Sequence, residues 1–341
     1  MLTVDLKNRI KRSGPLSFSD FVESCLYDLD EGFYTKRGSA GRRGDFLTSP
    51  EVGPFFGFLI ANWLDETWLK LNKPENFQVV EVGAGSGTLA RAIIDAQPHC
   101  LKNGVYTMVE RSQKLREEQP TSEKLVSATE IPDSPLVGAV IANELLDNLP
   151  FDLLEGDGEC WKEVCIGLMN DQFVETLMGE SKESVGVPPV KGARIPVQNK
   201  AHNWVENALE TIVSGSLLVI DYASTTQEMS QRPQDSWLRT FKKHSRGDNP
   251  LDNIGNQDIT VEVAIDQLPN GASVSTQRDF LKNQGIDRLV EEGRHIWKEF
   301  SSVGDLKAVK ARSRITEAEA LLDPDGLGGF FVLEWDLPSV D

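Results

Sequence analysis

Three glycines at alternate positions, set between an apolar run and a run of helix-forming residues, constrain the fold of this chain more than any other feature. They lie in VVEVGAGSGTLARAI, residues 79–93. The valines before them favour a β-strand and residues 88–93 favour a helix, so the pattern predicts a strand, a tight turn and a helix. Such a turn lets a ligand approach the backbone and leaves the first N–H groups of the helix free to bind it. We therefore expect a nucleotide-type ligand, in preference to a plain connection between a strand and a helix.

Three classes of nucleotide ligand compete for this turn. A phosphate-binding P-loop needs a Gly-Lys pair, and the chain has none. A dinucleotide fingerprint needs a glycine where Thr88 stands, and the carboxylate of Glu81 would repel a pyrophosphate. S-adenosylmethionine has an ammonium group and no phosphate, so Gly83, Gly85 and Gly87 can admit its methionine end while Glu81 lies near its amine. This cofactor is the leading expectation, with NAD second.

A second acidic residue supports the same ligand. The segment VYTMVERS, residues 105–112, is typical of a strand, and it ends in Glu110. An acid at this place in such sheets binds the ribose hydroxyls. Taken alone, Glu81 or Glu110 is also consistent with an ordinary solvated residue that binds no ligand. Together with the glycine turn they favour the methyl donor.

The charge of the chain argues against several classes of partner. Its 341 residues include 35 Lys and Arg and 53 Asp and Glu, for a net charge of -18. This charge argues against non-specific nucleic-acid binding and against adhesion to anionic membranes, and it suits a basic partner. The longest apolar run, FFGFLIANWL, is soon followed by two acids and is too short to span a membrane. The four cysteines and four histidines are scattered, so no metal site is expected.

The first residues give an expectation for the location of the protein. The segment MLTVDLKNRIKRSGPLSFSDF lacks the apolar core of a secretory signal, and its Asp5 fits poorly with an organelle presequence. We therefore expect a cytoplasmic protein.

The rest of the chain predicts an α/β fold. Apolar runs near 77–82, 105–110, 137–142 and 216–221 alternate with helical segments, which is typical of a doubly wound parallel sheet. We expect three parts. Residues 1–75 form a helical cap, residues 76–225 form the cofactor-binding core, and residues 226–341 complete the sheet.

Two stretches interrupt the alternation. WKEVCIGLMNDQFVETLM places alternating runs on both sides of Asn170 and Asp171, which predicts a hairpin inserted at about 159–178. Residues 223–257 are polar and predict an extended connection or lid. After them we expect helices near 277–284 and 287–300 and a final strand in GGFFVLEW.

The strand near 137–142 runs into VIANELLDNLPFD, where Asn143, Glu144 and Asp147 follow apolar residues. Methyl transfer requires the enzyme to align a nucleophile with the methyl group. A guanidinium nucleophile needs a carboxylate that holds it by paired hydrogen bonds, and Glu144 is the candidate for that role. Asn143 suits an amide or amine nucleophile instead. The alternatives are that Asp147 only starts a helix and that Asn143 and Glu144 only brace the loop.

The loop GDFLTSPE, residues 44–51, is a second candidate region. Ser49 followed by Pro50 is a good helix start, and it is open whether the segment only caps a helix. Because Arg42, Arg43, Asp45 and Thr48 crowd the same stretch, we favour a lid that closes on the cofactor.

These motifs together resemble the MidA family of S-adenosylmethionine-dependent methyltransferases. The resemblance runs through nearly the whole chain: LSFSDFVESCLYDLDEGFYT, GRRGDFLTSPEVGPFFG, EVGAGSGTLA, VERS, ANELLDNLPFD, IDYA, GNQDIT, STQRDFLKNQGI and GLGGFFVLEW. GDFLTSPE together with NELLDNLP is the most specific part. The chain departs from the family at two places. GAGSG stands for the usual Gly-Pro-Gly-Arg-Gly, and the segment from Asp258 lacks the family's histidine and second aspartate, with Glu262 and Ala264 in their places.

The resemblance implies a class I, Rossmann-like methyltransferase fold with a mostly parallel sheet of seven strands. It also implies a set of site residues. Asn143, Glu144 and Asp147 are expected to face the substrate, and Asp45, Thr48, Ser49 and Glu51 to border the site. The cofactor is expected to contact Glu81, Gly83, Ala84, Gly85, Gly87, Thr88 and Glu110.

The activity implied by the resemblance is protein arginine N-methylation with symmetric dimethylation, in the assembly of a respiratory complex. The partner is then a protein with an accessible arginine, and a homodimer is a further expectation. Two alternatives remain at this point. One is a small-molecule methyltransferase whose hairpin and lid enclose a compact substrate. The other is a cofactor-binding assembly chaperone without turnover, whose acidic surface binds a basic client.

Overall fold

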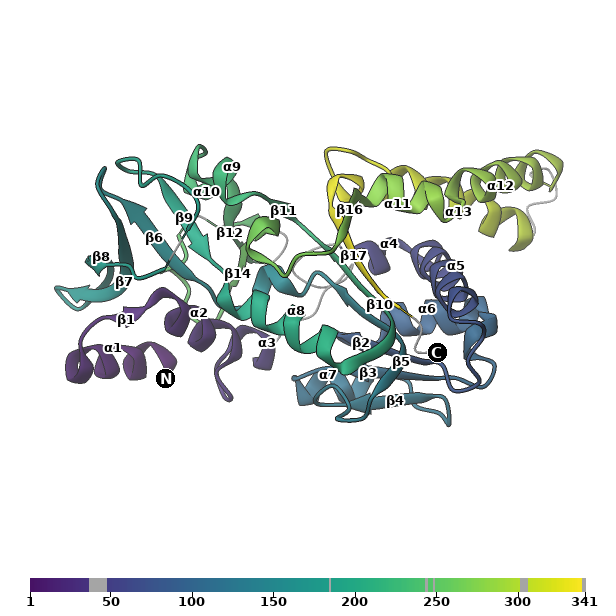
Figure 1. The fold of residues 1–341 in the computed structure, drawn as a ribbon, viewed down its shortest axis with the longest axis horizontal. Helices are drawn as coiled ribbons and strands as arrows, with labels where there is room; N and C mark the ends of the chain where they lie inside the picture. The colour runs from purple at the N-terminus through teal and green to yellow at the C-terminus, as the bar shows by residue number, and fades with distance from the viewer. Residues whose placement is uncertain (37–47, 184, 243–244, 248, 301–305, 339–341) are drawn as a thin grey trace.

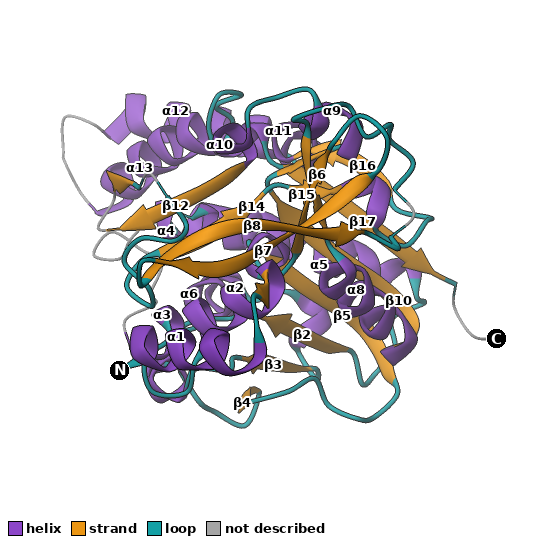
Figure 2. Ribbon diagram, turned by 90° about the vertical axis from the view of Figure 1, so that its left-hand side faces the viewer, coloured by secondary structure: helices purple, strands orange, loops and turns teal. Residues whose placement is uncertain are grey.

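The computed structural model describes residues 1–36, 48–183, 185–242, 245–247, 249–300 and 306–338. Seven strands in these ranges form the main sheet, in the order β16-β17-β10-β5-β2-β3-β4. Strands β4, β3, β2, β5 and β10 run parallel, and β17 is antiparallel to both β10 and β16, so the sheet is mixed. Figure 2 shows the parallel strands following one another across the sheet. The strands are β2 (Gln78–Val82), β3 (Val105–Val109), β4 (Leu125–Ala128), β5 (Leu136–Asn143), β10 (Ile212–Asp221), β16 (Ser273–Thr276) and β17 (Phe331–Leu337).

Both faces of the main sheet are covered. Side chains alternate along each strand, so Val79 belongs to one apolar core and Val80 to the other. The first core contains residues of α5, α6, α11 and α12, and the second contains residues of α8. Figure 1 shows α12 and α13 as a pair that projects beyond the sheet. The helices are α5 (Pro54–Lys70), α6 (Thr88–Ala96), α7 (Gln113–Glu118), α8 (Asn199–Thr211), α11 (Gln277–Asn283), α12 (Ile286–Phe300) and α13 (Leu306–Leu321).

A separate core lies beside the main sheet, at the left of Figure 1. It joins apolar residues from three distant parts of the chain, within 2–33, 151–166 and 229–264. Helix α2 begins after Ser17, whose side chain caps it by accepting a hydrogen bond from Asp20 N at 3.0 Å. The elements here are α1 (Leu2–Ser13), β1 (Leu16–Ser17), α2 (Phe18–Tyr27), α3 (Phe33–Lys36), β6 (Asp152–Gly156), β9 (Arg194–Val197) and β14 (Asp258–Val261).

The predicted hairpin is confirmed. Strands β7 (Trp161–Met169) and β8 (Gln172–Glu180) pair antiparallel across Asn170 and Asp171. Both turn residues have positive φ, 51° and 62°, which matches the twist of a two-residue hairpin turn. Strand β7 also pairs with β6 and β1, so the hairpin belongs to the sheet of the separate core.

The prediction of an extended connection over 223–257 is wrong. The described part of this stretch contains β11 (Ala223–Ser224), α9 (Thr226–Ser230), α10 (Gln234–Trp237), β12 (Leu238–Lys242) and β13 (Ser245–Arg246). Strand β12 pairs with β14, and β11 pairs with β15 (Val263–Ala264). The polar composition hid these elements, because their few apolar residues, such as Met229 and Trp237, are fully buried by contacts with distant segments.

Candidate active site

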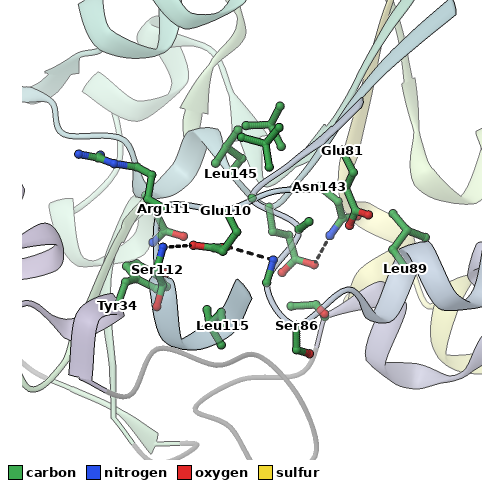
Figure 3. A pocket seen from close by; sticks show the side chains of 18 of the residues that line it. Tyr34, Glu81, Ser86, Leu89, Glu110, Arg111, Ser112, Leu115, Asn143 and Leu145 are labelled. Atoms are coloured by element: carbon green, nitrogen blue, oxygen red, sulfur yellow. Dashed lines mark hydrogen bonds between the residues drawn. The ribbon is translucent and has the colours of Figure 1, made fainter. Parts of the chain in front are cut away.

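A cavity of about 410 Å³ lies at the carboxyl ends of β2, β3 and β5. Its size is typical of a site for a small ligand or cofactor. The N-terminal helices contribute one wall and the glycine turn another (Figure 3). Of the predicted site residues, those lining it are Thr48, Glu51, Glu81, Gly83, Ala84, Gly85, Thr88, Glu110, Asn143 and Glu144.

The three glycines of the turn all have positive φ, but for different reasons. Gly83, Gly85 and Gly87 have φ of 73°, 53° and 80°. A Cβ at Gly87 would lie 2.9 Å from Met108 Sδ, and Gly87 does not line the cavity, so this glycine serves packing. A Cβ at Gly85 would meet no atom within 4 Å. Gly85 therefore leaves open a space that a ligand can occupy.

Glu81 is buried at the start of the turn. Its Oε2 accepts a hydrogen bond from the Tyr106 hydroxyl at 2.7 Å, and the residue is 5% exposed. Burial raises the pKa of Glu81 to about 8, and the charge of Glu110 adds to this effect, while the hydrogen bond from Tyr106 opposes it. A cation placed against this carboxylate would favour its ionised form.

Glu110 lies at the end of β3 and faces the cavity. Its two carboxylate oxygens accept hydrogen bonds from Gly85 N at 3.0 Å and Ser112 N at 2.8 Å (Figure 3). Burial raises the pKa of Glu110, and these backbone donors oppose the rise. The carboxylate thus connects the glycine turn to the loop after β3, at the place where the sequence predicts the ribose acid.

The helix start predicted at Ser49 is shifted by one residue. Helix α4 (Ser49–Val52) has Thr48 at its N-cap position, and Ser49 is the first helical residue. The Ser49 hydroxyl donates instead to Gln277 Oε1 at 2.9 Å, and Ser49 is buried away from the cavity. Glu51 does face the cavity, where its Oε1 accepts from Thr88 Oγ1 at 2.8 Å. Asp45, Arg42 and Arg43, and with them most of the predicted lid, lie outside the described residues.

Asn143 and Glu144 lie at the point where β5 ends. Glu144 has a φ of 51°, which is uncommon for a non-glycine residue, and its backbone N donates to Ile220 O at 2.8 Å. Its Oε1 accepts from Asn143 Nδ2 at 3.1 Å and from Ser49 N at 3.4 Å, and its Oε2 accepts from the Tyr222 hydroxyl at 3.4 Å. Burial, followed by the charge of Asp221, raises the pKa of Glu144 to about 8.

Asp147 does not line the cavity, contrary to the expectation that it faces the substrate. It lies in the short helix η2 (Leu146–Asn148), is 3% exposed, and its Oδ1 has no hydrogen-bond partner in the described ranges. Its backbone N and that of Leu146 donate to Asp221 Oδ2 at 3.2 and 2.9 Å. Burial, followed by the charge of Asp221, raises the pKa of Asp147.

The sequence did not identify several residues of the site. Tyr27 and Tyr34 line the cavity with rings stacked at 5.6 Å, and the Tyr34 hydroxyl donates to Asp258. Trp204 of α8 also lines it. Tyr222 follows β10 and reaches Glu144 from 78 residues away. Tyr27, Tyr34 and Tyr222 belong to motifs of the family resemblance, but nothing in those motifs assigns the tyrosines to the site, because only the fold brings them together.

The cavity therefore combines an open glycine turn with acids at one end. Glu144, Asp147 and Asp221 form no ion pair with a lysine, arginine or histidine of the described residues, while Asp221 accepts three backbone N–H bonds. Of these three acids Glu144 lines the cavity, and a carboxyl there without a cationic partner suits a cationic ligand.

Residues 59–282 match the model of a family described as S-adenosyl-L-methionine-dependent methyltransferases. The chain belongs to this family. Its reaction is methyl transfer and its cofactor is S-adenosylmethionine, as the glycine turn and Glu81 predict.

Relatives and solved structures agree with this assignment. The chain is 27% identical over 302 residues to a Drosophila melanogaster protein named protein arginine methyltransferase NDUFAF7 homolog, mitochondrial, covering 77% of this chain and 68% of the relative. It is 28% identical to the human protein arginine methyltransferase NDUFAF7, covering 83% and 73%. A crystal structure of a Burkholderia thailandensis protein bound to S-adenosyl-homocysteine has the same fold, with a TM-score of 0.83, 23% identity and coverage of 98% and 92%.

The cytoplasmic location expected from the first residues is wrong by this comparison, because the named relatives are mitochondrial proteins. An acidic residue near the start of the chain does not exclude an organelle location. No helix in the described ranges is long and apolar enough to cross a membrane.

Proposed function

We propose that this methyltransferase acts on arginine side chains of a protein. The observation that carries the proposal is Glu144, a carboxylate at the cavity wall in a strained backbone conformation and beside two further buried acids. A guanidinium group provides the cation that these acids lack, and it binds a carboxylate through two parallel hydrogen bonds. The names of the Drosophila and human relatives support the same substrate class.

The residues of the glycine turn fit the cofactor. The open space beside Gly85, which a Cβ would enter, would admit the ligand. Glu81 would hold its ammonium group, and Glu110 would hold its ribose. Ala84, Thr88 and Glu51 complete this wall. When bound, S-adenosylmethionine supplies an electrophilic methyl group.

Glu144 would have two tasks toward the arginine. Its ionised carboxylate would hold the guanidinium so that one nitrogen faces the methyl group. Replacement of an N–H by a methyl group releases one proton, and the raised pKa of Glu144, about 8, makes its carboxylate a suitable acceptor. Asn143 would keep the carboxylate in place, and Asp147, behind it, would act through Asp221 and not by contact with substrate.

The proposal also covers the fold class, the division of the chain into three parts and the details of the activity that the sequence predicts. The order of the seven strands and the helices on both faces support a class I, doubly wound, Rossmann-like fold. We also propose a core of residues 76–225 flanked by 1–75 and 226–341. Symmetric dimethylation in the assembly of a respiratory complex, and a homodimer, remain predictions.

Methyl labelling tests the proposal. Purified protein is incubated with a soluble protein extract and S-adenosylmethionine that carries a tritiated methyl group, and the labelled amino acids are identified after hydrolysis. We expect symmetric dimethylarginine, and a fall of at least about 100-fold for Glu144→Gln with the cofactor Kd unchanged within about threefold. The matched control is Glu117→Gln, at an exposed residue of α7.

Three outcomes would contradict the proposal. Label on another amino acid, or on a small molecule, would assign a different substrate class. Full activity of Glu144→Gln would remove the role of this carboxylate. Stable binding of a client protein without any methyl transfer would favour an assembly chaperone.

A further inference from the structure

We propose that Tyr222 is a positioning residue for Glu144, and that a cluster of Arg239, Glu262 and Arg232 holds Tyr222 in place. This inference rests on the proposed role of Glu144. Tyr222 does not line the cavity, so it acts through Glu144 and does not contact substrate.

The first step is the contact between the two side chains. Glu144 Oε1 already accepts from Asn143 Nδ2 and Ser49 N, whereas the Tyr222 hydroxyl is the one donor to Oε2 found among the described residues, at 3.4 Å. A carboxylate restrained at both oxygens presents its remaining lone pairs in a fixed direction. A substrate that binds through two parallel hydrogen bonds needs that direction to be fixed.

The second step is the support of the tyrosine ring. One side packs on Phe330, with ring centroids 4.1 Å apart, and the Arg239 guanidinium lies 5.9 Å from the ring centroid. Arg239 is held by Glu262 Oε1 at 2.6 Å, and Arg232 pairs with Glu262 Oε2 at 2.5 Å. Glu262 is 8% exposed, whereas the side chains of Arg239 and Arg232 are 26% and 36% exposed, so the carboxylate of the cluster is buried and its guanidinium groups partly face water.

The third step concerns charge. A free arginine close to Glu144 would compete with a guanidinium substrate for the carboxylate. Glu262 pairs with both Arg239 and Arg232, and neither arginine forms an ion pair with Glu144 in the described residues. The cluster thus supports the ring of Tyr222 without occupying the substrate's position.

The groups that face Glu144 predict how its titration depends on Tyr222. They are Asn143 on β5, Ser49 N on α4, Tyr222 after β10, and the acids Asp221 on β10 and Asp147 in η2. Tyr222 itself is surrounded by Glu144, Asp147, Asp221 and Arg239. A hydroxyl that donates to a carboxylate stabilises its ionised form, so removal of this donor must raise the pKa of Glu144.

The test follows the titration of Glu144 directly, in the whole protein and without a substrate. Protein labelled with ¹³C at the side-chain carboxyls of glutamate is titrated by NMR, and the signal missing in Glu144→Gln identifies Glu144. We expect Tyr222→Phe to raise the midpoint by about half a pH unit. Arg239→Gln should move it in the same direction, because the ring loses its support. The matched control, Arg246→Gln on the neighbouring strand β13, should leave it unchanged.

An unchanged midpoint in Tyr222→Phe would overturn the inference. If that variant fails to fold, an unchanged midpoint in Arg239→Gln would do so. With the arginine substrate, kcat of Tyr222→Phe should fall about threefold at pH 7 and recover as pH rises, while a merely structural defect would lower it equally at every pH. A shift of the midpoint without any arginine methylation would leave the positioning role intact and contradict only the proposed function.

Discussion

At the scale of single residues, the absence of a side chain at Gly85 is the feature most important for cofactor binding. The space in front of it is open, and its φ of 53° is one that glycine adopts at little cost. We expect Gly85→Val to abolish S-adenosylmethionine binding by calorimetry, because the new side chain fills that space.

The control for Gly85→Val must carry the same backbone strain. Gly192→Val meets this need, since Gly192 has a φ of 79° and open space around it but lies far along the chain from the turn. It should keep the wild-type Kd. Equal loss in both variants would mean that strain, and not occupation of the cofactor's space, explains the effect.

Glu144 predicts the pH dependence of the reaction. Its pKa is raised to about 8, and its ionised form is the one that binds a guanidinium. The ionised fraction therefore increases as pH rises, so kcat/KM should increase about tenfold per unit below pH 8 and level off above it. Rate measurements between pH 6 and 9 check this. A profile that is flat, or that falls with pH, would show that Glu144 does not act as a carboxylate.

At the scale of elements, the α12–α13 pair supports the start of α5. Glu317 of α13 is buried and accepts hydrogen bonds from Phe55 N at 3.0 Å and Ser313 Oγ at 2.6 Å. It therefore satisfies an N–H group in the first turn of α5, which has no partner within that helix. We expect Glu317→Ala to lower the free energy of unfolding by about 2 kcal/mol in denaturant titration.

The control for this prediction lies on the same helix. Glu319 is exposed, so Glu319→Ala should change stability by less than about 0.5 kcal/mol. Equal effects of the two variants would assign the loss to helix propensity or to net charge.

Elements were predictable from sequence where burial is regular. Strands β2, β5 and β10 are buried along nearly their whole length and give continuous apolar runs. The edge strand β4 has four residues, with Val126 42% exposed, and shows no such run. Strand β16 is largely exposed and helix α13 is polar, so neither gives a continuous apolar run, and neither was predicted from the sequence.

The site was predictable only where its residues are local. Glu81, Gly85 and Glu144 follow strands directly, so the change from apolar to polar residues indicated them. Tyr222 approaches Glu144, and Arg239 approaches the ring of Tyr222, from other elements; the sequence alone does not show that these residues are close in space. Ser49 was interpreted as a cap because its partner, Gln277, lies 228 residues away.

At the scale of the whole molecule, the cavity lies where two cores meet. The main sheet supplies the glycine turn, and the separate core supplies the wall with Tyr27 and Tyr34. Acids lie at this junction because they stand at the ends of buried strands: Asp221 is the last residue of β10, and Glu81 is next to the last residue of β2. The fold accommodates them by raising their pKa values, to about 8 for Glu81 and about 7 for Asp221, with burial as the main cause.

These raised pKa values predict how the stability of the cofactor-free protein depends on pH. Unfolded Glu and Asp have pKa values of about 4, so between about pH 4.5 and 8 the folded state binds more protons than the unfolded state. The free energy of unfolding must therefore fall as pH rises, by about 6 kcal/mol from pH 5 to 8 for Glu81 and Asp221 together, and urea titrations at several pH values measure it. Glu81→Gln should flatten the slope, since glutamine stays neutral, whereas the exposed Glu75→Gln should leave it unchanged. A stability that rises with pH over this range would show that the buried acids are ionised and paired in the folded protein, and it would remove the need for a cationic substrate to neutralise them.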